Sequence, residues 1–356
     1  MSDFVSARRF RNRLLLVSDS AGWVIQSVST ILHANLPSEL KPLVVTNNIH
    51  RARNCTIHFI NRLWAWSDDF LETISPSNRL IGLWWHGRRH SNDPETQTSL
   101  DRLISEHSRF DLIQVTCTPG LETLLEIGVP EEKTVLLPMG VDLKSFHHAV
   151  PLAERTQLRD RLGVPSNASV IGCFQKDGEG WEDGMEPKWI KGPDILANVL
   201  ENINQHHPIF VVIPGPARGY LKERLNQAGV PYAAPGLIST DELRKLYCVL
   251  DIYISPSRDE GGPAGALECM ASGIPLVSTR TGMPVDMIEN GENGLIVDVE
   301  DVDGLVACVS ELIDKPSFRE RLSGNALRTI QAYDWPVISQ RYIDELYLPV
   351  ISTKRS

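Results

Sequence analysis

The sequence lacks a paired cysteine pattern, a long apolar run and an excess of positive charge, and each absence excludes a class of protein. Its six cysteines lie far apart and mostly inside apolar stretches, which argues against a disulfide framework or a cysteine metal site. The apolar run at residues 14–17 is too short for a signal peptide or a membrane span. The net charge of −10 argues against a nucleic-acid partner. We therefore expect a cytoplasmic protein.

Two local patterns refine these exclusions. The first apolar strand is followed by SDSAGW and not by a three-glycine phosphate loop, which argues against a nicotinamide dehydrogenase. The stretch ARRFRNR at residues 7–13 is locally basic. It leaves two alternatives, a peripheral contact with anionic lipid at a membrane surface or a solvated approach to the first strand.

What the sequence does contain is a regular alternation of short apolar strands with amphipathic helical stretches. A chain of 356 residues is too long for one ordinary core, so two domains are expected. The alternation is typical of parallel α/β layers. A polar connector with two prolines, residues 147–168, interrupts it. The expected strands are 13–18, 42–46, 56–60, 79–85, 111–117 and 134–138, then 169–174, 208–214, 249–256, 274–279 and 293–298.

Two half-chains of similar plan predict two Rossmann-like domains with parallel sheets, at residues 1–150 and 151–335, facing across a cleft. Ligands of such sheets bind at the carboxyl ends of the strands. The segment EGGPAGALECMASGIPLV at residues 260–277 follows one of these strands. Its glycines let backbone N–H groups and a helix N-terminus approach a phosphate, and Pro263 suits the first turn of that helix.

Glu268 is the unusual residue of this segment, because it stands among apolar neighbours where a charge is costly. A carboxylate at this position is suited to accept two hydroxyl hydrogens, such as those of a ribose diol. The alternative is a capping or surface glutamate on a short helix. The apolar surroundings favour the functional interpretation.

Glu260, seven intervening residues, Glu268 and then CMASGIPLVST resemble the donor-site signature of the family 4 retaining glycosyltransferases, which have the GT-B fold. Further segments resemble that family in the same order. They are EIGVPEEKTVLLPMGVDLKSF, KGPDILANVL, LISTDELRKLYCVLDIYISPS, TGMPVDMIENGENGLIVD and YDWPVISQRYIDELY, together about the last two-thirds of the chain. The last of these resembles a terminal helix, 336–356, that crosses back to the N-terminal domain.

The resemblance implies a role for each matching residue of the donor site. Glu268 would bind the ribose, Glu260 the transferred sugar, and Lys191 the diphosphate. The backbone of Gly262, Pro263, Ala264 and Gly265 would cradle that diphosphate. A lysine and helix N-terminal amides stabilise the charge of a leaving diphosphate without a metal, so we expect no cofactor and no metal site.

The first half resembles the family less closely, as an acceptor-specific domain should. Gly22 follows the first strand, where the family has a Gly-rich loop close to the donor. LIGLWWHGRRH resembles the family's strand that ends in a His beside the reacting sugar, which would make His86 that residue, so we expect it to support turnover. Trp23 and Trp85 lie at strand ends and are candidates to stack on an acceptor sugar, with core packing as the alternative.

The sequence departs from the family pattern after the first strand of the second half. The family often has an Arg there, whereas this chain has FQKDGEGWEDGMEPKWIKG, in which Lys176 is the nearest substitute. Residues 177–189 of this insertion are expected to form a mobile flap, because their mixture of glycines, acids and tryptophans cannot pack on its own. A second, smaller departure is Asp286, where the family often has Glu.

The expected activity is the transfer of a sugar from a nucleotide-diphosphate donor to a saccharide or lipid-linked acceptor, with retained anomeric configuration. The family's usual work suggests surface polysaccharide or glycolipid biosynthesis. Two alternatives stay open: a nucleotide-sugar epimerase or phosphorylase on the same fold, and an inactive partner subunit of a glycosyltransferase. The presence of Glu260, Glu268 and Lys191 counts against the inactive subunit.

Overall fold

A computed structural model describes residues 12–18, 24–46, 49–60, 71–89, 94–146 and 151–352. The chain divides into two compact units, and each contains its own parallel sheet. The first unit consists of Met1–Gly140 and Trp335–Ser356, and the second of Val141–Asp334. The division falls after Gly140, earlier than the expected boundary at 150, and the chain re-enters the first unit at Trp335.

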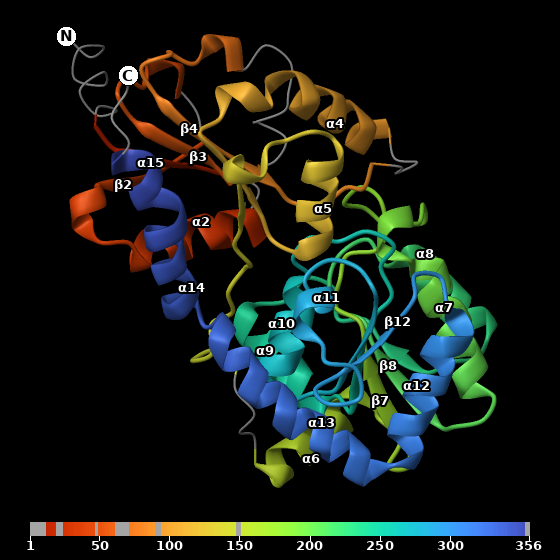
Figure 1. The fold of residues 1–356 in the computed structure, drawn as a ribbon. Helices are drawn as coiled ribbons and strands as arrows, with labels where there is room; N and C mark the ends of the chain where they lie inside the picture. Colours follow the sequence, from red (N-terminus) through yellow and green to blue (C-terminus); the bar gives the residue numbers. More distant parts are fainter. Residues whose placement is uncertain are drawn as a thin grey trace. The chain divides into compact units, whose positions relative to one another are not determined.

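The sheet of the first unit has six parallel strands in the order β2-β1-β3-β4-β5-β6 (Figure 1). β1 pairs with β2 on one side and β3 on the other, so the first strand lies inside the sheet and is fully buried. The strands are β1 Leu14–Val17, β2 Pro42–Val45, β3 Thr56–Phe59, β4 Arg79–Trp84, β5 Leu112–Val115 and β6 Thr134–Leu136. Each falls within a range expected from the apolar pattern.

Helices cover this first sheet, and three of its described helical segments come from the C-terminal end of the chain. α14 packs beside α2, although about 300 residues separate the two helices along the chain. The helices are α2 Val24–Asn35, α4 Pro94–Glu106, α5 Thr118–Glu126, α14 Trp335–Arg341 and α15 Leu348–Ser352, with a π-helical segment, Tyr342–Tyr347, between the last two. Shorter 3₁₀ turns lie at Ser38–Leu40, Ile49–Arg51, Leu71–Thr73, His107–Arg109 and Glu131–Lys133.

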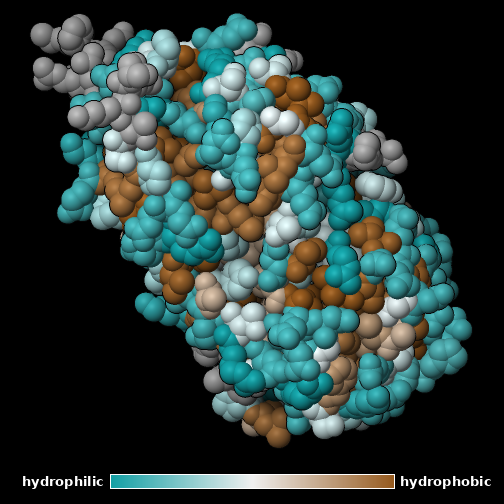
Figure 2. Space-filling view, in the orientation of Figure 1, coloured by the Kyte–Doolittle hydropathy of each residue, from teal (hydrophilic) through white to brown (hydrophobic). Residues whose placement is uncertain are grey.

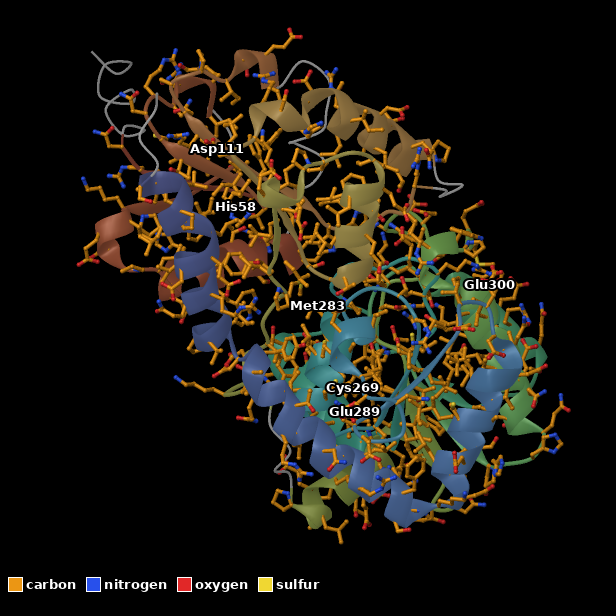
Figure 3. All side chains as sticks on the ribbon, in the orientation of Figure 1. His58, Asp111, Cys269, Met283, Glu289 and Glu300 are labelled. Carbon is orange, nitrogen blue, oxygen red and sulfur yellow. The ribbon has the colours of Figure 1, made fainter. Side chains whose placement is uncertain are left out.

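Buried polar contacts attach the C-terminal segment to the first sheet. The Nδ1 atom of His58, on β3, lies 3.0 Å from the hydroxyl of Tyr347. Gln114, on β5, donates to the hydroxyl of Tyr342 at 2.5 Å. Figure 3 labels His58, which is 1% exposed, and burial lowers the pKa of its imidazole to about 3. The imidazole therefore stays neutral at physiological pH, which identifies His58 as a core residue.

The sheet of the second unit also has six parallel strands, in the order β12-β11-β10-β7-β8-β9. The order reverses direction between β7 and β10, so the sheet is doubly wound about these two neighbouring strands. The strands are β7 Ser169–Gly172, β8 Ile209–Val212, β9 Tyr232–Ala233, β10 Ile252–Ser255, β11 Leu276–Thr279 and β12 Leu295–Val297. Only the two-residue β9 was not expected from the sequence.

Helices lie on both faces of the second sheet, with α7, α8 and α12 together on one face and α9, α10 and α13 on the other (Figure 1). The helices are α6 Leu152–Leu162, α7 Pro193–Asn204, α8 Gly219–Gln227, α9 Thr240–Val249, α10 Ala264–Ala271, α11 Pro284–Met287, α12 Val302–Asp314 and α13 Pro316–Thr329. Trp189–Lys191 and Ile330–Tyr333 are 3₁₀ turns. α9 begins with a capping box, in which Ser239 and Glu242 bond each other's backbone N–H.

The apolar periodicity of these helices explains how they pack. α13 buries Leu322 and Ala326, and its outer face is mostly hydrophilic in Figure 2.

The cysteines of the described chain are free thiols, four of them buried. In the part of the chain that the structure describes, no helix has both the length and the apolar character needed to cross a membrane.

Candidate functional site

The candidate site lies in the second unit, at the carboxyl ends of β7 and β10. β10 ends at Ser255, and the loop that follows carries Glu260. β7 ends at Gly172, and the loop that follows leads through residues 173–190 to Lys191. Because β7 and β10 are parallel neighbours, the loops that follow them lie at one edge of the sheet. Residues about 70 positions apart in the sequence meet there.

Lys191 and Glu260 form a short ion pair, with the Nζ atom 2.5 Å from Oε1. The Glu260 side chain is only 4% exposed, whereas that of Lys191 is 21% exposed. A buried carboxylate needs such a partner, because an unpaired charge away from water is costly. An ammonium group has three N–H donors, and Glu260 occupies one of them. Lys191 therefore keeps donors for a ligand anion while it neutralises Glu260.

Two polar residues that were not predicted from the sequence motif, Ser257 and Gln175, hydrogen-bond to this ion pair. The hydroxyl of Ser257 lies 3.1 Å from Oε1 of Glu260 and 3.1 Å from Oε1 of Gln175, and it donates to one of them at a time. Gln175 in turn donates from Nε2 to the backbone carbonyl of Lys191 at 2.6 Å. The loops after β7 and β10 are thus joined through side chains as well as through the ion pair.

The Lys-Gly sequence has a local structural reason. Gly192 adopts a φ of +63° at the start of α7, and a Cβ there would lie 2.3 Å from the carbonyl oxygen of Pro256. A residue with a side chain would have to displace the backbone of the loop that carries Glu260. Pro193 then begins the helix, where its missing N–H costs nothing. Glycine at this position lets Lys191 approach Glu260.

Arg258 also connects the loop after β10 to the start of α7. Its guanidinium donates to both oxygens of Asp194 in the first turn of α7, at 2.8 and 2.7 Å, and to Glu300 at 2.7 Å. The hydrogen bonds from Arg258 lower the pKa of Asp194. Figure 3 labels Glu300, which lies in the loop before α12. Because Arg258 is only two residues from Glu260, this network fixes the distance between that acid and α7.

Glu268 lies in the second turn of α10, one residue before Cys269, which Figure 3 labels. The hydroxyl of Tyr247, on α9, donates to its Oε2 atom at 2.7 Å. Removal from water raises the pKa of Glu268 to about 7, although the Tyr247 hydrogen bond acts in the opposite direction. A half-buried carboxylate with one donor is neither a helix cap nor an ordinary surface glutamate.

The turn before α10 differs in detail from the expectation. Pro263 caps the helix with an extended backbone, and Ala264 is its first residue, so the helix begins one position later than expected for proline in the first turn. A Cβ on Gly265 would lie 2.1 Å from the hydroxyl oxygen of Tyr253. Gly265 is therefore required by packing against β10. The N–H of Ala266 donates to the carbonyl of Pro263 at 2.9 Å. The two N–H groups before it, at the very start of α10, point out of the helix end, where an anion can accept from them.

The remaining predicted residues lie elsewhere. His86 and Trp85 follow β4 in the first unit, and both are half-buried. Gly22 and Trp23 lie outside the described residues. Lys176 stacks on the ring of Trp181, with its Nζ atom 4.9 Å from the ring centroid. Desolvation and the nearby Lys188 lower the pKa of Lys176.

The insertion at residues 177–189, expected to be a mobile flap that cannot pack on its own, contacts the start of α8. Its ends pair at Gly178 and Pro187, like a short hairpin. The carbonyl of Gly184 accepts from the N–H of Tyr220 at 3.0 Å, in the first turn of α8. The insertion thus supplies hydrogen-bond acceptors that the start of this helix would otherwise lack. Its Trp181 and Trp189 side chains are nevertheless about half exposed.

Among the described residues, no group of three or more His, Cys, Asp or Glu side chains is arranged to hold a metal ion. Asp301 has a different role, because its side chain caps α12 by accepting from the N–H of Gly304 at 2.8 Å. Lys191 contributes positive charge to the candidate site, and the start of a helix such as α10 carries a partial positive charge.

Known proteins resemble this chain in sequence and in fold. Residues 186–329 match the family described as Glycosyl transferases group 1. An uncharacterised glycosyltransferase of Methanocaldococcus jannaschii is 25% identical over 263 residues, 72% of this chain and 65% of the relative. A lipopolysaccharide core biosynthesis mannosyltransferase of Rhizobium meliloti is 29% identical over 60% of this chain and 59% of the relative. Over the most similar curated relatives, the match spans 46% to 65% of their lengths.

The solved structure of the Anabaena protein HepE in complex with UDP superposes with a TM-score of 0.73 at 18% identity, covering 94% of this chain and 99% of that one. At this identity the likeness establishes the fold, which is GT-B with its two Rossmann-like domains. The family match lies wholly inside the second unit and contains Lys191, Glu260 and Glu268. Residues 186–329 of this chain match the family model of the glycosyl transferases group 1, and the chain has the GT-B fold.

Proposed function

We propose that this chain transfers a sugar from a nucleotide-diphosphate donor to a saccharide or lipid-linked acceptor, with retention of the anomeric configuration. The observation that carries the proposal is the Lys191–Glu260 ion pair at the carboxyl edge of the second sheet, in which Glu260 belongs to the loop that leads into α10. A lysine with spare donors and a helix N-terminus together provide a site for a diphosphate. Glu260 and Glu268 add two hydrogen-bond acceptors for a sugar and a ribose.

The relatives support the same assignment. Their names include a D-inositol 3-phosphate glycosyltransferase from Acidothermus cellulolyticus and the Rhizobium meliloti mannosyltransferase. The Anabaena structure with the same fold was solved with UDP and also with UDP-glucose. These names favour a nucleotide-sugar donor and work on surface glycolipids or polysaccharides.

In this proposal the chemistry at the leaving group is electrostatic. Negative charge develops on the diphosphate as the bond to the sugar breaks, and Lys191 and the first N–H groups of α10 stabilise that charge. Glu268 holds the ribose and Glu260 the sugar, so that the reacting carbon keeps its place. Of the first unit, His86 is proposed to support turnover, Gly22 to bind the donor, and Trp23 and Trp85 to stack on the acceptor sugar. The retained configuration is proposed from the family resemblance.

Calorimetry on two alanine variants tests this division of roles. UDP, GDP and ADP, each alone and as its glucose or mannose conjugate, are first screened by thermal shift, because a bound ligand raises the apparent stability. Glu268→Ala should weaken the bare nucleotide by roughly ten- to a hundredfold, since it removes a charge-assisted hydrogen bond. Glu260→Ala should bind the bare nucleotide normally and lose affinity for the nucleotide sugar, transfer rate, or both.

Glu320→Ala is the matched control, because it removes the same charge from an exposed position on α13. It should bind every ligand as the wild type does. If the two site variants bind the bare nucleotide equally well, the proposed roles of the two acids are wrong. If no nucleotide or nucleotide sugar stabilises the wild type, the glycosyltransferase proposal itself fails.

A further inference from the structure

The side chain of Glu268 accepts a hydrogen bond from Tyr247, a residue enclosed by the protein. Tyr247 is fully buried, at 0% exposure, and its hydroxyl lies 2.7 Å from Oε2 of Glu268. No other hydrogen-bond partner of the Glu268 side chain is found among the described residues. One carboxylate oxygen is therefore anchored to the protein, and the other remains for a ligand on a half-buried residue.

Three aromatic rings of the same unit fix the ring of Tyr247. Phe174 lies at 4.5 Å between ring centroids, and Tyr253 and Phe146 each lie at 5.8 Å. These rings come from the loop after β7, from β10 and from the segment before α6, so Tyr247 is enclosed from several sides. An enclosed ring has little rotamer freedom, so the position of its hydroxyl is set before a ligand binds.

We propose that Tyr247 is a positioning residue for the nucleotide, and that its hydroxyl fixes the orientation of Glu268 so that the second carboxylate oxygen is presented to the ribose. This inference rests on the proposed function, in which Glu268 binds the ribose. Tyr247 itself touches no part of the donor in this proposal. Its effect on binding is transmitted through one hydrogen bond.

The same hydrogen bond makes nucleotide binding depend on pH in a predictable direction. The groups that interact electrostatically with Glu268 are the hydroxyls of Tyr247 and Tyr253 and the thiol of Cys269. Burial raises the pKa of each of these three groups above its usual range, so all three are neutral wherever Glu268 titrates. Tyr247 donates to the ionised carboxylate and so favours the form that accepts two hydroxyl hydrogens.

The experiment compares Tyr247→Phe with Tyr253→Phe. Both remove a hydroxyl from the same aromatic cluster, but the Tyr253 hydroxyl accepts from the N–H of Phe174 and does not bond Glu268. Calorimetry gives the dissociation constant of whichever of UDP, GDP and ADP binds most tightly, from about pH 6 to 9. This range spans the Glu268 pKa of about 7. Wild-type affinity should fall as the pH drops through that range.

Tyr247→Phe should move the midpoint of this fall upward by about one pH unit, and the affinity at neutral pH should be roughly fivefold weaker. The loss should shrink at the alkaline end, where Glu268 is ionised in both proteins. Tyr253→Phe should keep the wild-type midpoint. If Tyr247→Phe also keeps that midpoint, or if both variants shift it equally, the positioning role of Tyr247 is overturned.

A second substitution keeps the test decisive if Tyr247→Phe does not fold. Replacing Tyr247 with 3-fluorotyrosine preserves the ring and makes the hydroxyl a stronger donor, so the midpoint should move downward. An unchanged midpoint would also contradict the proposal. The Glu268→Ala variant separates the two hypotheses: if it binds nucleotide like the wild type, the ribose role fails, whereas if only the tyrosine variants are silent, the inference alone fails.

Discussion

At the scale of single residues, the candidate site contains two acids, Glu260 in a loop and Glu268 on the helix that follows, and their surroundings differ. Glu260 has a cation, Lys191, at 2.5 Å, whereas Glu268 has only the neutral hydroxyl of Tyr247. A cation supports the ionised form, while burial without a cation opposes it. The pKa of Glu268 is therefore raised to about 7. Glu268 shows that residue type alone does not specify the pKa of a carboxyl group.

This raised pKa predicts a stability cost. Between the ordinary value of 4.5 and about 7, the folded protein binds a proton at Glu268 that the unfolded chain has already released. Stability therefore falls as the pH rises through this window and stays lowered above it. Glu268→Gln removes the titration and should raise the free energy of unfolding at alkaline pH by about 1–3 kcal/mol relative to its effect at acidic pH.

Urea unfolding of the wild type and the variant at both ends of this pH window measures the difference. Glu320→Gln, which makes the same chemical change at an exposed position, is the control and should show no such dependence. If the wild type and Glu268→Gln keep the same pH dependence, the carboxyl group is not destabilised in the folded protein. The same variant should bind nucleotide poorly, which would explain why the costly residue is present.

At the scale of elements, the insertion at residues 177–189 illustrates how a segment with little apolar content becomes ordered. Gly184 has a φ of +68°, and a Cβ there would lie 2.3 Å from the backbone carbon of Ala217. This close approach lets the carbonyl of Gly184 reach the N–H of Tyr220 at the start of α8. Backbone hydrogen bonds to a helix end replace the apolar contacts that the segment does not have.

Gly184→Ala should therefore detach the insertion from α8. Gly180→Ala is the matched control, because Gly180 has a similar φ of +65° and open space where the Cβ would be placed. Both variants pay for the left-handed backbone, but only Gly184→Ala adds a clash with backbone atoms. We expect its free energy of unfolding to be lower than that of Gly180→Ala by about 1–3 kcal/mol.

Limited proteolysis should show the same contrast, with faster cleavage within residues 177–189 of Gly184→Ala than of Gly180→Ala. Thermal unfolding of the two variants provides the stability difference. Equal stability and equal cleavage would mean that the insertion does not depend on its contact with Ala217. The tryptophan emission of the insertion, from Trp181 and Trp189, reports in addition whether it moves when donor is added.

At the scale of the whole molecule, the proposed function makes a claim about metals. The described residues contain no cluster of His, Cys, Asp and Glu that could hold an ion, and Lys191 with the start of α10 supplies positive charge at the candidate site. We expect transfer to proceed without a divalent cation. Dialysis against EDTA should leave the rate unchanged, and added magnesium or manganese should not increase it. Activity that is lost in EDTA and restored by either ion would contradict this expectation.

The sequence alone determined the class of fold and predicted where along the chain the candidate site lies. Strands of consecutive apolar residues between amphipathic helices indicate buried parallel sheets, because both faces of such strands are covered. All eleven expected strands are present, and Lys191 and Glu260 do meet. Such patterns are local, so periodicity and a spaced motif are sufficient to recognise them. The two-residue β9 has too short a pattern to be recognised in this way.

Only the tertiary structure decided how the site is held together. Gln175, Ser257 and Tyr247 lie on different loops and helices, and no spacing in the sequence connects them to Lys191, Glu260 or Glu268. Their contacts depend on the order of β7 and β10 in the sheet, which brings distant loops to one edge. The same holds for Gly265, whose neighbour is the hydroxyl of Tyr253. Distances across a sheet follow from strand order and packing, and a linear pattern carries neither.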